Sequence, residues 1–349
     1  MEVFFILILI ADICKEINQP ILRRKLKIFL NYFVGPALFV WLSFSIYHQV
    51  KQQGDVQQSW HLIKAAFLGP SAWKIGLVML LMLLNWGIEA YKWQLLVSRL
   101  QKISFLRAFS AIFSGQAFAL NTINRAGDFV GRVLYLEEGN RLRAVALSLV
   151  GSISQLLVTF AVGIFALVGL RRHLLQNGNM LQGLSEFWLD GLIIGLIPGI
   201  LCFALFYFEL PLFTKLVEKI PFVHRFRYLI EKVEALSKKE LTRILLLSFI
   251  RYLVFVLQYV VLLEVFGVEA SKLDLAMMVA VLFLVMAMVP TIALAELGFR
   301  GKISLQLFGL LSVNTIGIVS AAAGIWIINL ILPAIIGSIL MVGIRLFKR

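Results

Sequence analysis

The stretch LNTINRAGDFVGRVLYLEEGNRLR (residues 120–143) interrupts a chain that consists mainly of uncharged hydrophobic runs. Directly after an apolar segment it places four polar or charged residues within nine positions, namely Asn124, Arg125, Asp128 and Arg132. If the stretch is helical, Arg125, Asp128 and Arg132 have the spacing i, i+3 and i+7 and share one face. The cluster therefore predicts a break in the apolar pattern and a site at which these charged groups contact an interaction partner.

The composition of the whole chain is that of a membrane protein. Of its 349 residues, 60% are hydrophobic and 15% charged, and the mean hydropathy is +0.91. The formal net charge of +14 would indicate nucleic-acid binding in a soluble protein, but no aromatic and basic RNA-binding motif accompanies it. We expect basic cytoplasmic loops and anionic lipid headgroups instead, and no nucleic acid. The two cysteines, Cys14 and Cys202, provide neither a disulfide framework nor a CxxC metal site.

Six apolar segments are good candidates for full membrane spans, because each has about the 20 residues that a helix needs to cross the hydrocarbon core. They are 28–50, 73–96, 144–170, 191–208, 244–267 and part of 303–344. The last run has 42 residues without a charge, so it must contain a span and a further segment. Two other segments, 104–120 and 275–295, are candidates for re-entrant or broken helical hairpins.

An internal repeat organises these segments. A shift of 170 residues places 73–96 on 243–266, 104–120 on 274–290 and 144–170 on 314–340. The same shift places FVGRV (129–133) on FRGKI (299–303). We therefore divide the chain into an N-terminal extension, a first membrane repeat and a second membrane repeat, at 1–21, 22–187 and 188–349.

Basic residues predict the orientation of the chain. Lysine and arginine concentrate in 15–27, 92–143, 209–243 and the final RLFKR, and the positive-inside rule places such regions in the cytoplasm. Six crossings and two re-entrant hairpins satisfy this rule for all four regions, whereas seven or eight spans are the alternative. The sequence thus predicts an all-α polytopic bundle in the cell membrane, with an inverted repeat and both termini cytoplasmic.

Three stretches carry a resemblance to a known family: EAYKWQLL (89–96), residues 121–159, and VPTIALAELGFRGKISLQLFG (289–309). They resemble the transmembrane region of lysylphosphatidylglycerol synthase/flippase proteins. The family usually has Thr-Pro-Asn-Arg-x-Gly-Glu where this chain reads TINRAGD (122–128). The resemblance implies a stand-alone flippase-like membrane domain without the lipid-aminoacylating synthase domain.

The charged residues suit a lipid headgroup, because arginine can hold a phosphate through two hydrogen bonds and stays charged. Glycines beside them let the lipid or backbone approach closely. The residues predicted to bind the headgroup are Asn124, Arg125, Gly127, Asp128, Arg132, Glu296 and Arg300. Those predicted to line the pathway or couple the cycle are Glu89, Lys92, Arg251 and Pro290. The alternative is a cytoplasmic loop in which Asp128 neutralises Arg125 and Arg132.

The leading functional hypothesis is a flippase or transporter that moves a polar or charged lipid between leaflets. Its partners would be membrane lipids with an anionic or phosphate-bearing headgroup, with a separate lipid-modifying enzyme and a homo-oligomer left open. The first alternative is a non-catalytic membrane partner of a glycosyltransferase or lipid synthase, and the second is a membrane-embedded transferase. We expect no enzymatic activity, cofactor or metal, because the four histidines lack metal spacing and no HEXXH, Walker A or GxSxG pattern occurs.

Overall fold

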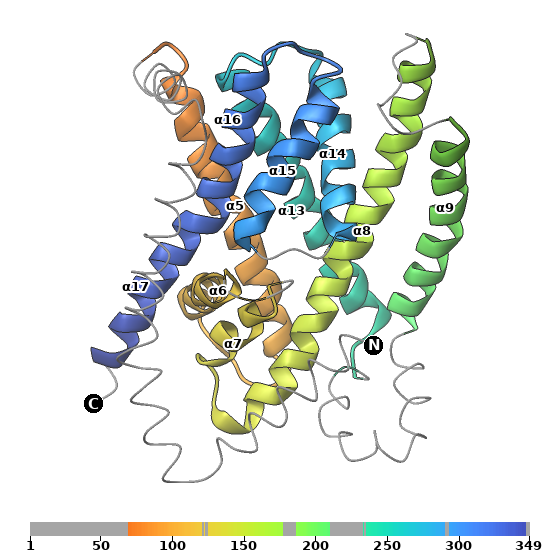
Figure 1. Ribbon diagram of the computed structural model, residues 1–349. Coiled ribbons are helices and arrows are strands. Elements are labelled where there is room, and N and C mark those ends of the chain that lie inside the picture. Colours follow the sequence, from red (N-terminus) through yellow and green to blue (C-terminus); the bar gives the residue numbers. More distant parts are fainter. Residues whose placement is uncertain are drawn as a thin grey trace.

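The computed structural model describes residues 69–120, 122, 125–176, 186–209, 233, 235–289 and 293–346. This part of the chain is helical and contains no strand (Figure 1), which confirms the prediction of an all-α bundle. The extension 1–21, the apolar segment 28–50, Asn124 and Pro290 lie outside the described residues. The elements are α5 (Ala72–Val97), α6 (Phe105–Ala119), α7 (Gly127–Val133), the 3-10 turn η2 (Glu138–Asn140), α8 (Arg141–Gln176), α9 (Glu186–Phe208), α13 (Lys238–Val265), α14 (Lys272–Met288), α15 (Ala293–Phe308), α16 (Thr315–Trp326), the π-helical turn η3 (Ile327–Ile331) and α17 (Leu332–Leu346).

Four helical stretches of the described chain are long and apolar enough to cross a membrane: α5, α8, α13 and the continuous run from α16 through η3 into α17. Helix α9 adds a shorter apolar stretch, Ile194–Phe208. A helix rises about 1.5 Å per residue, so the 26 residues of α5 exceed the roughly 30 Å hydrocarbon core. The charge-free run 303–344 divides as its length required, into the end of α15 and the span formed by α16 and α17.

Local sequence signals set the ends of these helices. The Ser104 hydroxyl accepts a hydrogen bond from the Arg107 amide at the start of α6. Ser237 and Glu240 form a reciprocal capping box at the start of α13. Gly267, with φ +72°, ends α13, and the Val268 amide reaches back to the Leu263 carbonyl at 3.0 Å. This left-handed position favours glycine and terminates the helix before α14 begins.

Helices α6 and α7 form a tight hairpin. The two helices cross where Gly131 meets Gly115, and a Cβ added to Gly131 would lie 2.5 Å from the Gly115 Cα. Below this crossing, the Ser114 and Tyr135 hydroxyls share a 2.7 Å hydrogen bond. Burial raises the pKa of Tyr135, so its hydroxyl stays neutral and available for this bond. Residues 104–120 are therefore one arm of a hairpin and not a full span.

Helices α5 and α13 run antiparallel in the middle of the bundle. Lys74 near the start of α5 contacts Glu264 near the end of α13 at 2.8 Å, and Arg99 just after α5 contacts Glu240 at the start of α13. Each helix is followed by a hairpin, α6–α7 after α5 and α14–α15 after α13. Because α5 and α13 end at opposite ends of the molecule, the two hairpins enter it from opposite ends (Figure 1).

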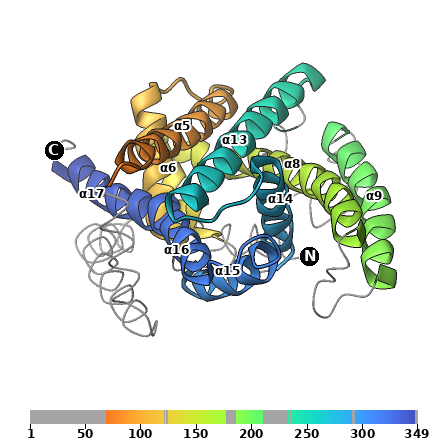
Figure 2. The same ribbon diagram turned by 90° about the horizontal axis from the view of Figure 1, so that it is seen from above.

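Each hairpin packs on the long helix of the other half. Helix α6 lies against α17, and α14 lies against α8, as seen from above in Figure 2. Glycines permit both crossings, since a Cβ at Gly163 of α8 would lie 2.7 Å from the Leu284 Cβ, and one at Gly337 of α17 would meet the Phe113 carbonyl. The halves therefore share a continuous apolar core, whose largest cluster draws on α5, α8, α13, α14, α15 and α16.

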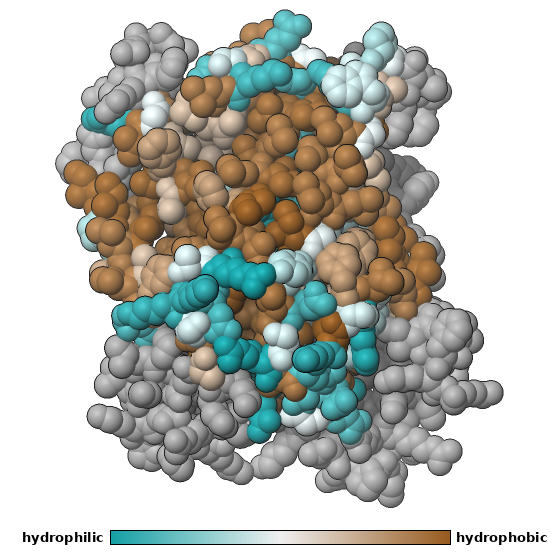
Figure 3. All heavy atoms as spheres, turned by 180° about the vertical axis from the view of Figure 1, so that it is seen from behind, coloured by the Kyte–Doolittle hydropathy of each residue, from teal (hydrophilic) through white to brown (hydrophobic). Residues whose placement is uncertain are grey.

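The surface has the polarity expected of a membrane protein. On the face shown in Figure 3, hydrophobic residues form a broad belt, with hydrophilic residues below it and along its upper rim. Exposed apolar side chains of this kind contact lipid without a cost in a bilayer. Among the largest are Leu80, Leu84, Phe165, Ile194, Leu201 and Leu253.

Candidate functional site

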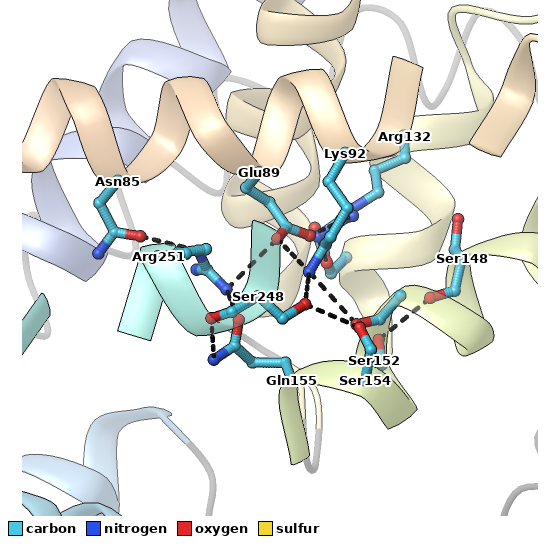
Figure 4. A network of polar contacts seen from close by, with 12 residues as sticks. Asn85, Glu89, Lys92, Arg132, Ser148, Ser152, Ser154, Gln155, Ser248 and Arg251 are labelled. Carbon is cyan, nitrogen blue, oxygen red and sulfur yellow. Dashed lines mark hydrogen bonds and ion pairs between the residues drawn. The ribbon is translucent and has the colours of Figure 1, made fainter. Parts of the chain in front are cut away.

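The carboxylate of Glu89 is the centre of a buried charged cluster (Figure 4). Glu89 is 5% exposed and lies on α5. Its Oε1 contacts Arg132 Nη1 of α7 at 2.9 Å, and its Oε2 contacts Lys92 Nζ at 2.8 Å and Arg251 Nη1 of α13 at 3.3 Å. Residues predicted for the headgroup and residues predicted for the pathway therefore meet in one cluster.

Arg132 is held by two carboxylates. Besides Glu89, it contacts Asp128 one turn earlier on α7. The second oxygen of Asp128, Oδ1, accepts a hydrogen bond from Gln116 Nε2 of α6 at 3.3 Å. Buried guanidinium groups need such partners, because the loss of hydration costs several kcal/mol per ion.

Lys92 is the most deeply buried charge of this cluster, at 1% exposure. Its ammonium donates to the Gly151 carbonyl at 3.3 Å and to the Ser248 hydroxyl at 3.2 Å, in addition to its contact with Glu89. Ser248 is in turn 2.8 Å from the Ser154 hydroxyl. Small residues of α8 and α13 thus make room for the lysine and supply its oxygen ligands.

The side chain of Arg251 extends from α13, in the second half of the chain, to polar groups of the first half. Its Nε donates to Asn85 Oδ1 at 2.7 Å and its Nη1 to Gln155 Oε1 at 3.1 Å. The guanidinium also lies over the Trp86 ring, 5.3 Å from the centroid, a favourable cation–π arrangement. Arg251 therefore connects α13 to both α5 and α8.

A second charged cluster surrounds Glu296 on α15. Its Oε2 accepts from Arg125 Nη2 at 3.0 Å, and its Oε1 contacts Arg300 Nη2 on the next turn. The Tyr259 hydroxyl of α13, which interacts with Arg300, lies 3.2 Å from the Ser304 hydroxyl. Arg300 is 6% exposed, and in the described part of the chain its Nε and Nη1 have no hydrogen-bond partner.

The hairpin of each half carries an acid–arginine pair. Asp128 and Arg132 form an acid–arginine pair one turn apart on α7, and Glu296 and Arg300 form the same pair on α15, 168 residues later. Glu89 of α5 stands beside Arg132 as Tyr259 of α13 stands beside Arg300. The second half therefore replaces a carboxylate with a neutral hydroxyl.

The structure corrects the prediction for Arg125. Helix α7 begins at Gly127, so Arg125 lies in the turn before it and does not share a helical face with Asp128 and Arg132. Its φ of +58° is the one left-handed non-glycine value among the described residues. The side chain leaves the first hairpin and reaches Glu296 of the second. Asp128 accordingly neutralises Arg132 and makes no ion pair with Arg125.

Several predicted and unpredicted residues complete the site. Gly127 is buried at the tip of the first hairpin, where a Cβ would meet the Phe118 backbone. Sequence reasoning missed Asn85, Gln116 and Ser248, because single uncharged polar residues are common in apolar helices. Their contacts with charged groups set them apart.

Taken together, the clusters hold more positive than negative charge. Five cations (Lys92, Arg125, Arg132, Arg251 and Arg300) accompany three carboxylates (Glu89, Asp128 and Glu296), which leaves a surplus of two positive charges. Charges interact strongly where water is largely excluded. The described residues contain no group of His, Cys, Asp and Glu suited to a metal ion. The arrangement is thus chemically suited to bind an anion.

Comparison with known proteins agrees with these observations. The profile of the family described as "Lysylphosphatidylglycerol synthase TM region" matches residues 28–337, which is most of the chain. A comparison with curated proteins gives no significant match. Membership in this family implies a membrane function related to lipids. The chain belongs to the lysylphosphatidylglycerol synthase transmembrane-region family.

Proposed function

We propose that this protein is a non-enzymatic lipid flippase that moves a polar or charged lipid between the leaflets of the cell membrane. The observation that carries the proposal is the meeting of the two hairpins. They enter from opposite ends of the bundle, and Arg125 of the first contacts Glu296 of the second at 3.0 Å. A polar headgroup needs a polar site at membrane depth that each end can reach in turn.

The lower end of the bundle in Figure 1 is assigned to the cytoplasm. There α5 and α9 end and α8 and α13 begin. Basic residues outnumber acidic ones at this end, as the positive-inside rule requires of cytoplasmic loops. The basic residues are Arg99, Lys102, Arg107, Arg141, Arg143, Lys238, Lys239 and Arg243, and the acidic ones are Glu137, Glu138, Glu209 and Glu240. With this orientation the end of α17 lies on the cytoplasmic side, and for the N-terminus a cytoplasmic location is proposed from the basic residues of 15–27 alone.

The headgroup would use the surplus positive charge. In this arrangement Arg132 serves the cytoplasmic side and Arg300 the opposite side, while Arg125 stands between them. Arginine binds phosphate oxygens bidentately and keeps its charge at every physiological pH. The acyl chains would stay in the bilayer along the apolar belt, so the protein shields only the headgroup during its passage.

The test is lipid movement by the purified protein in liposomes. Fluorescent phosphatidylglycerol is placed in both leaflets, and a membrane-impermeant reductant bleaches the outer leaflet. The flippase exposes inner-leaflet label to bleaching, and Arg300→Gln slows this exposure about tenfold or more, because removing an interaction to a charged group costs about 1.5–3 kcal/mol. Arg107→Gln is the matched control, since Arg107 lies exposed at the start of α6. Bleaching that stops at the outer leaflet with folded wild-type protein, for phosphatidylglycerol and for zwitterionic and aminoacylated lipids alike, would refute the proposal.

A further inference from the structure

The carboxylate of Glu296 bridges two arginines in the way that a phosphate would. One oxygen contacts Arg125 and the other contacts Arg300. Two oxygens directed at two guanidinium groups are the minimum arrangement of an anion shared between arginines. Glu296 therefore already occupies the place in which the anion of a ligand would be expected.

This bridge leaves Arg300 incompletely satisfied. The guanidinium is 6% exposed, yet its Nε and Nη1 have no hydrogen-bond partner among the residues that the structure describes. Arg132, on the first hairpin, contacts both Asp128 and Glu89, and its Nε alone lacks a partner among the described residues. Buried donors without acceptors are costly and rare. An anion with three oxygens, such as a phosphate group, supplies the acceptors that a single carboxylate lacks.

Arg125 is the movable side of the bridge. Its side chain is 40% exposed, whereas the side chains of Glu296 and Arg300 are each 8% exposed. Its backbone has a left-handed φ of +58°, a conformation that persists for a non-glycine residue only where the surroundings hold it. The contact with Glu296 joins the tips of the two hairpins, and Leu120 and Leu297 belong to one apolar cluster with residues of α16 and α17.

We propose that Glu296 is a built-in placeholder anion, which a phosphate-bearing ligand displaces from Arg125 and Arg300 when it binds. Displacement breaks the ion pair between the hairpin tips, so occupation of the site and separation of the hairpins become one event. The proposal rests on the proposed function for its ligand, a lipid headgroup phosphate. We therefore expect that removing the negative charge of Glu296 strengthens ligand binding.

The experiment measures affinity in purified protein by calorimetry with two probes, lysophosphatidylglycerol and inorganic phosphate. Glu296→Gln removes the competing charge and should bind lysophosphatidylglycerol at least about fivefold more tightly than wild type, the lower end of common coupling effects. Glu264→Gln is the matched control, because Glu264 also contacts two cations, Lys74 and Lys272, but lies outside the site. Its affinity should equal that of wild type.

A shorter acid guards against failure of the first variant to fold. Glu296→Asp keeps the charge but loses one methylene, so it reaches one arginine and not both, and its affinity should rise in the same direction by a smaller factor. Unchanged or weaker binding in every folded Glu296 variant overturns the proposal. A rise that is equal for inorganic phosphate identifies the free ion as the ligand and overturns the lipid assignment, whereas a rise confined to the lysolipid supports it.

The liposome assay separates the two proposals. If wild-type protein moves lipid but the Glu296 variants bind with wild-type affinity, the placeholder is wrong and the flippase stands. If the variants bind more tightly but no form of the protein moves lipid, the placeholder stands and the flippase fails.

Discussion

Arg132 and Arg300 each pair with an acid one turn earlier on a hairpin helix, but Arg132 contacts two carboxylates and Arg300 contacts one. The difference comes from α5 and α13, which present Glu89 to the first arginine and Tyr259 to the second. A symmetric fold therefore carries an asymmetric charge distribution. In the proposed flippase, such asymmetry would give the two sides of the site different affinities for the same headgroup.

Removal of the Glu89 carboxylate should destabilise the protein strongly. Glu89→Gln leaves Lys92, Arg132 and Arg251 without their shared partner, and breaking a buried ion pair costs about 3–5 kcal/mol. Thermal unfolding in detergent should show a clear loss of stability. Glu240→Gln, which breaks the exposed pair with Arg99, should cost no more than about 1 kcal/mol. Equal unfolding temperatures for the two variants would contradict the central role of Glu89.

The crossing of the first hairpin should not tolerate a methyl group. Gly131→Ala places a Cβ 2.5 Å from the Gly115 Cα and 2.5 Å from the Ser114 carbonyl oxygen. Backbone atoms cannot move aside as a flexible side chain does, so we expect a loss of about 1–3 kcal/mol, as in overpacked cores. Gly139→Ala is the control, since nothing lies within 4 Å of its added Cβ. A stable, fully active Gly131→Ala protein would show that the two helices are further apart.

Substitution of Arg251 by lysine should impair function although the charge is kept. The guanidinium reaches Asn85 through Nε and both Gln155 and Glu89 through Nη1, a fork that a single ammonium cannot reproduce. We expect lipid movement to fall about tenfold, a loss of about 1.4 kcal/mol. Lys239→Arg, an exchange of the same two residue types at an exposed position, should retain the wild-type rate. Wild-type transport by Arg251→Lys would reduce the role of Arg251 to charge alone.

The orientation of the second hairpin is open to chemical labelling. In a background without Cys14 and Cys202, Ser312→Cys lies between α15 and α16, and Glu138→Cys lies between α7 and α8. An impermeant maleimide added to intact cells should label position 312, whereas position 138 should react only after the membrane is opened. Labelling of both positions from outside would refute the inverted arrangement.

The helices could be predicted because the length of an apolar run and the positions of charged residues determine whether it can span the bilayer. Apolar runs long enough to span the bilayer indicated α5, α8, α13 and the last helix, although α5 and α13 carry internal charges, and the shortness of 104–120 indicated a hairpin. The apolar pattern also located the repeat, since its period does not depend on side-chain contacts.

The site was predictable only as a set of charged residues. Glu89 and Arg251 lie 162 positions apart, and no local pattern states that they form an ion pair. Arg125 was assigned to a helical face because its spacing fits one, but the start of α7 at Gly127 sends it to the other half of the chain. Tertiary packing decides such partners, and hydrophobic periodicity does not contain that information.

The exchange of hairpins between the halves also fixes the order in which the molecule is completed during synthesis. Helix α6 packs on α17, which begins at Leu332 and follows all the other described helices in the chain. Until α17 is made, the first hairpin can pack on α5 and α8 but lacks its contact in the other half. A chain that stops before Leu332 would therefore leave the first hairpin without α17. Membrane proteases would then attack this hairpin, although the truncation itself lies about 200 residues further along the chain.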